Sequence, residues 1–285
     1  QLNLFLELTR LKKPIGYMLL FWPCAWGLTL AYDFSNNIKI YFFYLILFFL
    51  GSVLMRSAGC IVNDILDRKF DKKVSRTKNR PIASKKVSIL LGLFYALTLC
   101  LLALIVLLNF NYFTIILALG SMPLAFTYPL MKRFTYWPQL FLGVTFNYGL
   151  ILGWTSINNE INLLPLVFYL GAIFWTLGYD TIYGFQDIKD DEIIGLKSTS
   201  IKFKTKPYFF LFLCYSVFFL SLIFIGFNSD MKQIYFIFLL LVFFQMFFKQ
   251  LKKLNIKSQS SCLEVFKSNN VLGALIFVGL LISKY

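Results

Sequence analysis

Histidine is absent from the 285 residues of this sequence. A chain without it has no imidazole to bind zinc or haem and no base for a Ser-His-Asp triad. The five cysteines are spread along the chain with no CxxC pair: Cys24, Cys60, Cys100, Cys214 and Cys262. Isolated cysteines of this kind are typical of small packing residues. We therefore expect no metal centre built from nitrogen or sulfur ligands.

Charge is also scarce. Only 14% of the residues are charged and 13 are acidic, whereas 59% are hydrophobic and the mean hydropathy is +0.71. A soluble domain has roughly 25% charged residues. The composition therefore predicts an integral membrane protein whose main surroundings are the lipid bilayer.

Nine apolar runs are close to the length of about 20 residues that a helix needs to cross a hydrocarbon core roughly 30 Å thick. They cover residues 14–32, 40–62, 88–108, 112–130, 137–155, 162–184, 207–227, 232–249 and 268–283. Their apolar residues are continuous, whereas barrel strands alternate over about ten residues. The sequence predicts an all-α integral membrane protein with nine transmembrane helices around a central cavity that opens to the cytoplasmic side.

The connections between these runs are short, so residues 1–285 are expected to form a single transmembrane domain. The segment 1–13 mixes leucines and a phenylalanine with polar residues, and it predicts a short helix on the membrane surface.

The net charge of +15 is distributed unevenly. With nine spans and an inner N-terminus, 24 basic residues fall on the inner side, and only Lys39, Lys232 and Lys284 fall on the outer side. This asymmetry follows the positive-inside rule and predicts a cytoplasmic N-terminus. It explains the basic composition without nucleic acid, which would need a basic folded face. Nothing in the sequence indicates an obligate protein partner.

The few acidic residues gather in two clusters. The first, in the stretch CIVNDILDRKFDKKV, consists of Asn63, Asp64, Asp67 and Asp71. The second, in YGFQDIKDDEIIG, consists of Asp187, Asp190 and Asp191. Members four residues apart share one face of a helix. Both clusters are expected in a polar rim at the cytoplasmic ends of their spans rather than in a packed core.

Carboxylates placed so closely repel one another unless a cation lies between them. Hard oxygen ligands favour Mg²⁺, which is commonly shared between carboxylates and substrate phosphates. Basic residues that can contact phosphate surround the clusters: Lys72, Lys73, Arg76, Lys78, Arg80, Lys132, Arg133, Lys189 and Lys197. The residues therefore predict a metal-bound diphosphate at one membrane face.

Two ionisable residues lie deeper in the spans. Arg56 precedes Asn63 by seven residues, and Asp180 precedes Asp187 by the same interval. Charges inside a membrane usually face the bundle interior, so both are expected to point into a shared cavity, where they could also form a structural ion pair. Spans 137–155 and 162–184 also carry aromatic residues, of which a minority is expected to line an apolar binding site and most to pack or to face lipid: Phe146, Tyr148, Trp154, Phe174, Trp175 and Tyr179.

Four stretches carry a family resemblance: RLKKPIGYMLLFWP at 10–23, RSAGCIVNDILDRKFDKKVSRTKNRPIAS at 56–84, YPLMKRFTYWPQ at 128–139 and YDTIYGFQDIKDDEIIGLKST at 179–199. In this order they resemble the UbiA superfamily of membrane prenyltransferases, and within it the branch that acts on 4-hydroxybenzoate. The family pattern NDxxDxxxD matches the first cluster, and its second pattern DxxxD matches Asp187 and Asp191. After residue 200 only the hydrophobic pattern agrees.

The resemblance implies an enzyme that joins a polyprenyl diphosphate to an aromatic acid, at the ring carbon ortho to the hydroxyl, for ubiquinone biosynthesis. It implies Mg²⁺ as cofactor, held by Asn63, Asp67, Asp71, Asp187 and Asp191, the four aspartates being catalytic. The expected diphosphate contacts are Lys72, Arg76, Lys132 and Lys197. Arg56 and Arg133 are expected to bind the acceptor carboxylate, with Asp64, Asp180, Tyr183 and Asp190 as further candidates. Such an enzyme is expected in a bacterial or mitochondrial inner membrane, with its site on the cytoplasmic or matrix side.

One departure from the family and several alternatives remain open. The family often has a histidine where this chain has Tyr136, so a carboxylate or water must accept any proton that such a histidine would take. Naphthoate and homogentisate are alternative acceptors, whereas haem is disfavoured by the lack of histidine. A cation or proton-coupled transporter would use Arg56 and Asp180 as pathway residues, but the outer halves of the spans offer almost no polar path. A non-enzymatic lipid-diphosphate carrier would leave Arg56 without a role.

Overall fold

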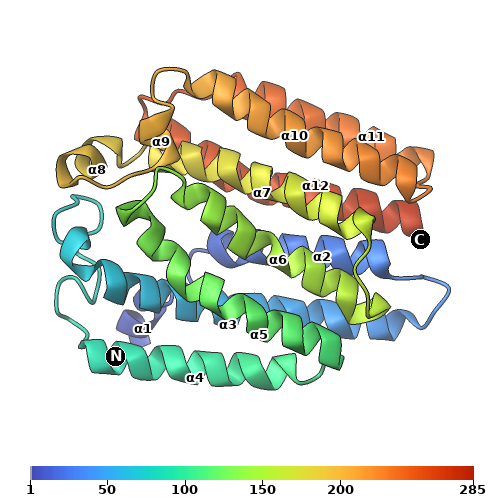
Figure 1. Ribbon diagram of the computed structural model, residues 1–285, viewed down its shortest axis with the longest axis horizontal. Coiled ribbons are helices and arrows are strands. Elements are labelled where there is room, and N and C mark those ends of the chain that lie inside the picture. Colours follow the sequence, from blue (N-terminus) through green and yellow to red (C-terminus); the bar gives the residue numbers. More distant parts are fainter. Residues whose placement is uncertain (1) are drawn as a thin grey trace.

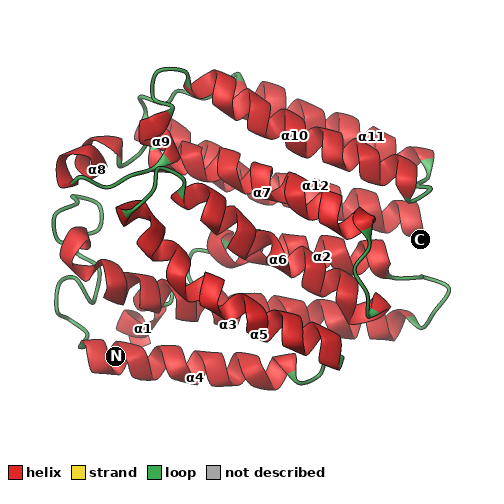
Figure 2. Cartoon of the chain, viewed as in Figure 1, coloured by secondary structure: helices red, strands yellow, loops and turns green. Residues whose placement is uncertain are grey.

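The computed structural model describes residues 2–285, and every regular element in that part of the chain is a helix (Figures 1 and 2). In chain order the elements are α1 (Leu2–Leu8), α2 (Ile15–Ala31), α3 (Ile38–Asp71), α4 (Ile89–Leu107), α5 (Tyr112–Thr127), η1 (Tyr128–Arg133), α6 (Pro138–Asn158), α7 (Leu163–Gly184), α8 (Ile188–Ile194), α9 (Thr199–Lys202), α10 (Pro207–Asn228), α11 (Gln233–Phe243), η2 (Phe244–Leu251) and α12 (Gln259–Lys284). The prediction of an all-α chain is confirmed.

Eight of these helices, among residues 2–285, are long and apolar enough to cross a membrane. They are α3, α4, α5 with η1, α6, α7, α10, α11 with η2, and α12. Helix α2 is apolar but has only 17 residues and falls just short of that length, so the count of nine spans stays a prediction. The long helices lie roughly side by side as one bundle (Figure 1).

Several helix ends differ from the predicted boundaries. Helix α3 runs unbroken to Asp71, well beyond the predicted 40–62, and so carries the whole first acidic cluster. The predicted span 112–130 ends as an α-helix at Thr127, because Pro129 lies at the start of a tighter 3-10 turn, η1. The predicted span 232–249 finishes as a π-helical segment, η2.

The core is centred on the contact between α2 and α6. A Cβ atom added at Gly27 would lie 2.0 Å from the Leu150 carbonyl oxygen, and one at Gly153 would lie 2.3 Å from the Cys24 carbonyl oxygen. The two backbones can approach this closely only because both positions lack a side chain. Beside them Trp26 is fully buried, stacks on Phe168 at 5.5 Å and donates from Nε1 to the Gly273 carbonyl at 3.0 Å.

The opposite flank of the bundle is packed less. Helix α5 has one buried residue, Thr114, whose hydroxyl donates to Thr155 of α6 at 3.0 Å. Helix α4 presents many of its leucines outward, including Leu90, Leu97 and Leu101. In a bilayer these apolar faces of α4 and α5 meet lipid, which supports the integral membrane character of the chain.

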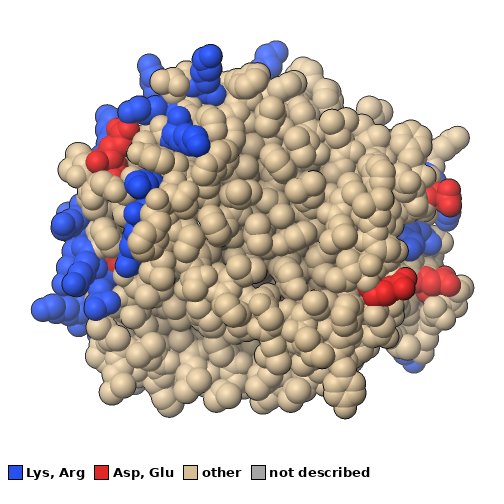
Figure 3. Space-filling view, in the orientation of Figure 1, with Lys and Arg blue, Asp and Glu red and all other residues tan. Residues whose placement is uncertain are grey.

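Charged side chains gather at the two ends of the bundle and leave an apolar belt between them (Figure 3). Both acidic clusters lie at one end, with α8 and the loop 72–88 (Figure 1). The same-side placement follows from α3 and α7, because each of these helices ends at a cluster.

Accessibility labelling should place both site loops on one side of the membrane. Single cysteines introduced at Lys78 and Lys189 should react with an impermeant maleimide from the same side of sealed vesicles, and one at Lys232 should react only from the other side. The five native cysteines are first replaced by Ala or Ser, in a variant verified as active. Labelling of positions 78 and 189 from opposite sides would contradict the arrangement.

Candidate active site

The first cluster is formed by the C-terminal turns of α3. Asn63, Asp67 and Asp71 lie on one stripe, because the helix continues without interruption through them. Asp64, Asp67 and Asp71 are 2%, 1% and 6% exposed. The expectation of a polar rim is therefore wrong for these three aspartates. They are buried because η1 and the loop 72–88 bring basic side chains against them.

Each buried carboxylate of this cluster has a basic partner. Lys132 of η1 donates to Asp67 Oδ2 at 2.5 Å. Arg80 donates to Asp71 at 2.9 Å and to Asp64 at 3.1 Å. Burying a carboxylate without such a partner is costly, so these ion pairs offset the cost of burying the three aspartates.

Arg133 also meets this cluster. Its Nη2 donates to the Leu66 carbonyl at 2.8 Å and lies 3.7 Å from Asp67 Oδ1, while the guanidinium stacks on Phe70 at 5.1 Å. The side chain is thus held against α3 at the level of the carboxylates.

The second cluster begins where α7 ends. After Gly184 the chain turns, and Asp187 becomes the first residue before α8, with the Asp191 N–H donating to the Asp187 carbonyl at 2.9 Å. This bond preserves the helical spacing between the two carboxylates although α7 itself has stopped.

The loop 72–88 joins the two clusters. Arg76 makes a two-pronged hydrogen bond to the Asp187 carboxylate, with Nε donating to Oδ1 at 2.8 Å and Nη2 to Oδ2, and its Nη1 donates to the Tyr183 hydroxyl at 2.8 Å. Ser75 donates from its backbone N–H and its hydroxyl to Asp190, at 3.2 and 3.1 Å. The chain thus brings Tyr183, Asp187 and Asp190 to the same loop that follows the first cluster.

Asp191 is the least compensated carboxylate of the site. No side-chain hydrogen bond or ion pair to it is formed within residues 2–285, and burial, followed by the neighbouring Asp187 carboxylate, raises its pKa to about 6. Lys132 and Arg76 lie close enough to oppose this shift. Lys132, which binds Asp67, therefore lies between the two clusters.

A hard divalent cation fits these donors. Asp67 Oδ1 is buried without a hydrogen-bond partner in the described chain, and the Asn63 side chain likewise makes no hydrogen bond within residues 2–285. Together with Asp191 they offer oxygen atoms that a metal can use. Within residues 2–285 no three acidic or cysteine side chains are close enough to hold one ion, and Arg76 and Lys132 are hydrogen-bonded to Asp187 and Asp67.

Two of the basic residues predicted to bind diphosphate, Lys72 and Lys197, make no hydrogen bond to a carboxylate of the site within residues 2–285, unlike Arg76 and Lys132. Lys197 donates to the Phe134 carbonyl at 3.1 Å and lies 5.6 Å above the ring of Tyr136, the position where the family often has histidine. Lys72 is exposed and its side chain makes no hydrogen bond within residues 2–285. Both stay available to a solvent-side ligand.

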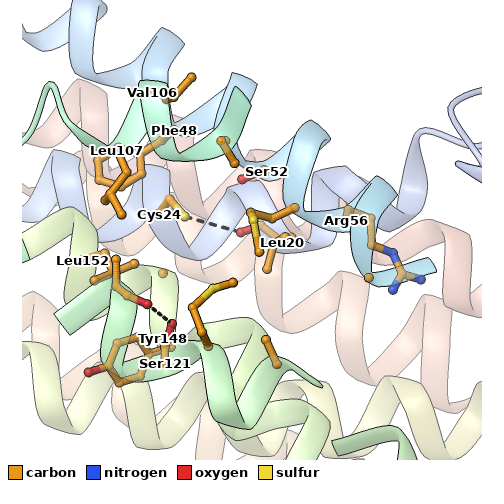
Figure 4. Close-up of a pocket in the computed structure, with 18 of the residues that line it drawn as sticks. Leu20, Cys24, Phe48, Ser52, Arg56, Val106, Leu107, Ser121, Tyr148 and Leu152 are labelled. Atoms are coloured by element: carbon orange, nitrogen blue, oxygen red, sulfur yellow. Dashed lines mark hydrogen bonds between the residues drawn. The ribbon is translucent and has the colours of Figure 1, made fainter. Parts of the chain in front are cut away.

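Below the clusters lies a cavity of about 380 Å³ between α2, α3, α4, α5 and α6. Its walls are apolar, and Figure 4 shows Arg56 at one end, with Phe48, Val106 and Leu107 toward the other. Arg56 is two helical turns before Asn63 on α3, so the charged end of the cavity faces the carboxylates. Tyr128, the first residue of η1, lines the same end.

The Arg56 guanidinium has no hydrogen bond or ion pair within residues 2–285. It lies 5.2 Å above the ring of Phe146, and a Cβ atom at Gly16 would come within 2.9 Å of its Nε. Asp180 is near enough to interact electrostatically but forms no ion pair with it and is not among the cavity-lining residues. The alternative of an Arg56–Asp180 ion pair is therefore not realised in this structure.

The six aromatic residues considered for the apolar binding site divide into two that line the cavity and four that belong to the main core or pack against it: Trp154, Phe174, Trp175 and Tyr179. Phe146 and Tyr148 line the cavity. Trp175 and Tyr179 instead pack together in the main core at 5.0 Å, with Trp175 donating to Asn269 at 2.8 Å. Their helix, α7, faces α10 and α12 rather than the cavity, which hydropathy alone could not reveal.

The model of the UbiA prenyltransferase family matches residues 20–276 of the chain. The chain belongs to this family. The family prediction is confirmed, and so is the prediction of a membrane prenyltransferase enzyme. The eight helices of residues 2–285 that are long and apolar enough to cross a membrane, and the apolar belt of the bundle, agree with a membrane protein (Figure 3).

Relatives and solved structures of the UbiA family agree with this assignment. The chain is 44% identical to the mitochondrial 4-hydroxybenzoate polyprenyltransferase of Bos taurus, covering 98% of this chain and 74% of the relative. It is 42% identical to the enzyme of that name from Arabidopsis thaliana, and the match covers 98% of this chain and 68% of the relative. A UbiA homologue from Aeropyrum pernix superposes with a TM-score of 0.78 at 20% identity, covering 94% and 98%.

A UbiA homologue from Archaeoglobus fulgidus, bound to GPP and Mg²⁺, superposes with a TM-score of 0.72 at 16% identity, covering 98% of this chain and 99% of that one. The agreement extends over nearly the whole length of both molecules. The UbiA fold therefore includes the helices after residue 200, where the sequence motifs end.

Two contributors to the site were not predicted by the sequence analysis. The sequence counts Arg10 only among the basic residues of the inner side, yet Arg10 donates to Asp64 at 2.6 Å. Arg80 had been named only among nearby cations, yet it joins two of the aspartates. No periodicity links these residues to α3, since 54 residues separate Arg10 from Asp64.

Proposed function

We propose that this UbiA protein transfers a polyprenyl group from polyprenyl diphosphate to the ring carbon ortho to the hydroxyl of 4-hydroxybenzoate, with Mg²⁺ as cofactor, in ubiquinone biosynthesis. The observation that carries the proposal is the apolar cavity whose charged end holds the unpaired Arg56 beneath two carboxylate clusters. Relatives more than 40% identical bear the name of this activity.

The prenyl donor would place its two ends in different surroundings. The apolar walls of the cavity suit an isoprenoid chain, since burying each CH₂ group contributes about 0.8 kcal/mol. The diphosphate would lie among Lys72, Arg76, Lys132 and Lys197, with Asn63, Asp67, Asp71, Asp187 and Asp191 holding Mg²⁺. The A. fulgidus homologue bound to GPP and Mg²⁺ supports this pairing of ligands.

The acceptor would lie between the cavity and the carboxylates. A carboxylate buried there needs a cation, and Arg56 offers a guanidinium that no residue in 2–285 engages. Arg133 lies against the Asp67 end of α3 and is the second candidate for the acceptor carboxylate. Tyr128 lines the cavity near Arg56 and would border the ring.

The chemistry follows from this arrangement. The allylic C–O bond breaks and diphosphate leaves with the bonding electrons. The ring carbon then forms the new C–C bond, and the ring proton passes to a carboxylate or to water. Mg²⁺ supplies charge neutralisation for the departing diphosphate. Arg76 and Lys132 would add hydrogen bonds to the same group, and the apolar cavity would keep water from the allylic cation. The site would face the cytoplasm or, in a mitochondrial inner membrane, the matrix.

The acceptor assignment is tested at Arg56. Arg56→Lys should raise the KM for 4-hydroxybenzoate about tenfold or more, because a charge-assisted hydrogen bond is worth about 1.5–3 kcal/mol and Lys cannot reproduce the two-pronged geometry. The KM for polyprenyl diphosphate should change much less. Steady-state kinetics of the purified protein with labelled acceptor measure both values.

Arg68→Lys is the matched control, because Arg68 lies on the same helix and donates only to the Ile65 carbonyl. Naphthoate and homogentisate are assayed in parallel. Unchanged 4-hydroxybenzoate kinetics in both Arg56→Lys and Arg133→Lys would mean that the carboxylate is recognised elsewhere or that the acceptor has none.

A further inference from the structure

Arg10 connects the surface helix α1 to the first cluster. It follows α1 in a turn with a left-handed φ of 56°, a conformation that is strained for a residue other than glycine. The turn aims its guanidinium inward, where Nη2 donates to Asp64 Oδ1 at 2.6 Å. The strain is therefore associated with a specific contact to a residue that is 2% exposed.

Arg80 continues the connection. Its Nη1 lies 3.1 Å from the same Asp64 oxygen and 2.9 and 3.0 Å from the two oxygens of Asp71. Asp64 and Asp71 are about two turns apart on α3, so one guanidinium cross-links them. The result is an unbroken chain of charged hydrogen bonds, Arg10–Asp64–Arg80–Asp71, which we name the arginine relay.

The arginine relay has its own apolar support. Leu8, Ile61, Ile65, Ile82 and Val87 belong to a hydrophobic cluster separate from the main core. Leu8 is two residues from Arg10, and Ile82 is two residues from Arg80. Both arginines are thus fixed by packing at their backbones as well as by hydrogen bonds.

Asp64 differs from the other aspartates of the site in its charge environment. One of its oxygens already accepts from two arginines, and neither arginine belongs to α8 or η1. Two guanidinium groups on one carboxylate disfavour a third cation there. Asp64 therefore suits a supporting role better than metal ligation.

We propose that Arg10, Asp64 and Arg80 are positioning residues that orient Asp71 for the metal, so that α1 acts on the site through the arginine relay. The proposal rests on the proposed Mg²⁺ site. Residues that orient metal ligands typically change metal affinity about 10–100-fold when replaced, while the ligands themselves remain present.

The test compares Mg²⁺ dependence across variants. Asp64→Asn should raise the Mg²⁺ concentration for half-maximal rate about tenfold, with kcat at saturating Mg²⁺ within about threefold of the unaltered protein. Arg10→Gln should shift Mg²⁺ dependence in the same direction. Lys12→Gln is the matched control, since Lys12 is exposed in the same turn, and it should shift nothing.

Coupling is measured with the double variant Arg10→Gln/Asp64→Asn, whose shift should be no larger than that of Asp64→Asn alone. Thermal unfolding is recorded for each variant. Lower stability with unchanged Mg²⁺ dependence would make the relay merely structural and overturn the proposal. Loss of turnover in Asp64→Asn that no Mg²⁺ concentration restores would make Asp64 a ligand and also overturn it.

Failure of the proposed function is distinguishable from failure of this proposal. If the proposed function is wrong, the unaltered protein itself will show no prenyl transfer, or prenyl transfer that does not depend on Mg²⁺. This result is obtained before any variant is compared.

Discussion

We expect Asp191→Asn to lower kcat by about 10²–10³-fold, because the site loses one negatively charged ligand of the metal that binds the diphosphate, while the fold is kept. Asp191 is half-buried and its side chain has no partner within residues 2–285, so the substitution breaks no existing ion pair. Asp67 is a poorer choice for substitution, since it is 1% exposed and its loss would strand Lys132.

Metal removal should have the same effect. Turnover should stop in excess EDTA and return when Mg²⁺ is restored, as measured by transfer of labelled prenyl groups. Glu192→Gln is the neighbouring control, because Glu192 pairs with the exposed Lys204 at 2.6 Å. Full activity of the Asp191→Asn protein, or of the chelated enzyme, would refute the assigned metal site.

The second large effect concerns folding. Gly153→Val should prevent the close contact of α2 and α6, since its Cβ would lie 2.3 Å from the Cys24 carbonyl oxygen and 2.6 Å from the Leu28 nitrogen. Both neighbours are backbone atoms that cannot turn away. We expect a loss of about 3 kcal/mol or more, seen as a large drop in the thermal unfolding midpoint in detergent or as loss of monodisperse protein.

Gly120→Val is the matched control, because a Cβ at Gly120 of α5 has nothing within 4 Å. It should retain wild-type stability within about 1 kcal/mol. If Gly153→Val unfolded at the same temperature as Gly120→Val, the close backbone contact would not exist.

Hydropathy and helical spacing were sufficient to predict the membrane helices and the stripe of the first cluster. They work because a helix fixes which residues share a face, and because a bilayer requires long apolar runs. The same reasoning placed Asp187 and Asp191 on one face. The predicted span 162–184 agrees with α7, which ends at Gly184. The sequence could not show that Asp187 and Asp191 lie beyond this helix, at the start of α8, where Arg76 of a distant loop holds Asp187.

The sequence could not predict which basic residues pair with the aspartates of the first cluster. Whether Lys132 binds Asp67 or solvent depends on how η1 folds over α3, and no local pattern encodes it. The burial of Asp64 and Asp67 follows from those long-range pairs. Asp180 does not line the cavity, although it is spaced from its cluster as Arg56 is.

The contact between α2 and α6 has a further consequence. With backbone against backbone, these two helices cannot slide past each other, so one wall of the cavity is stiff. The opposite wall is formed by α4 and α5, where α5 has only Thr114 buried. Changes in bilayer fluidity should therefore alter the mobility of the α4–α5 wall of the cavity more than that of the α2–α6 wall.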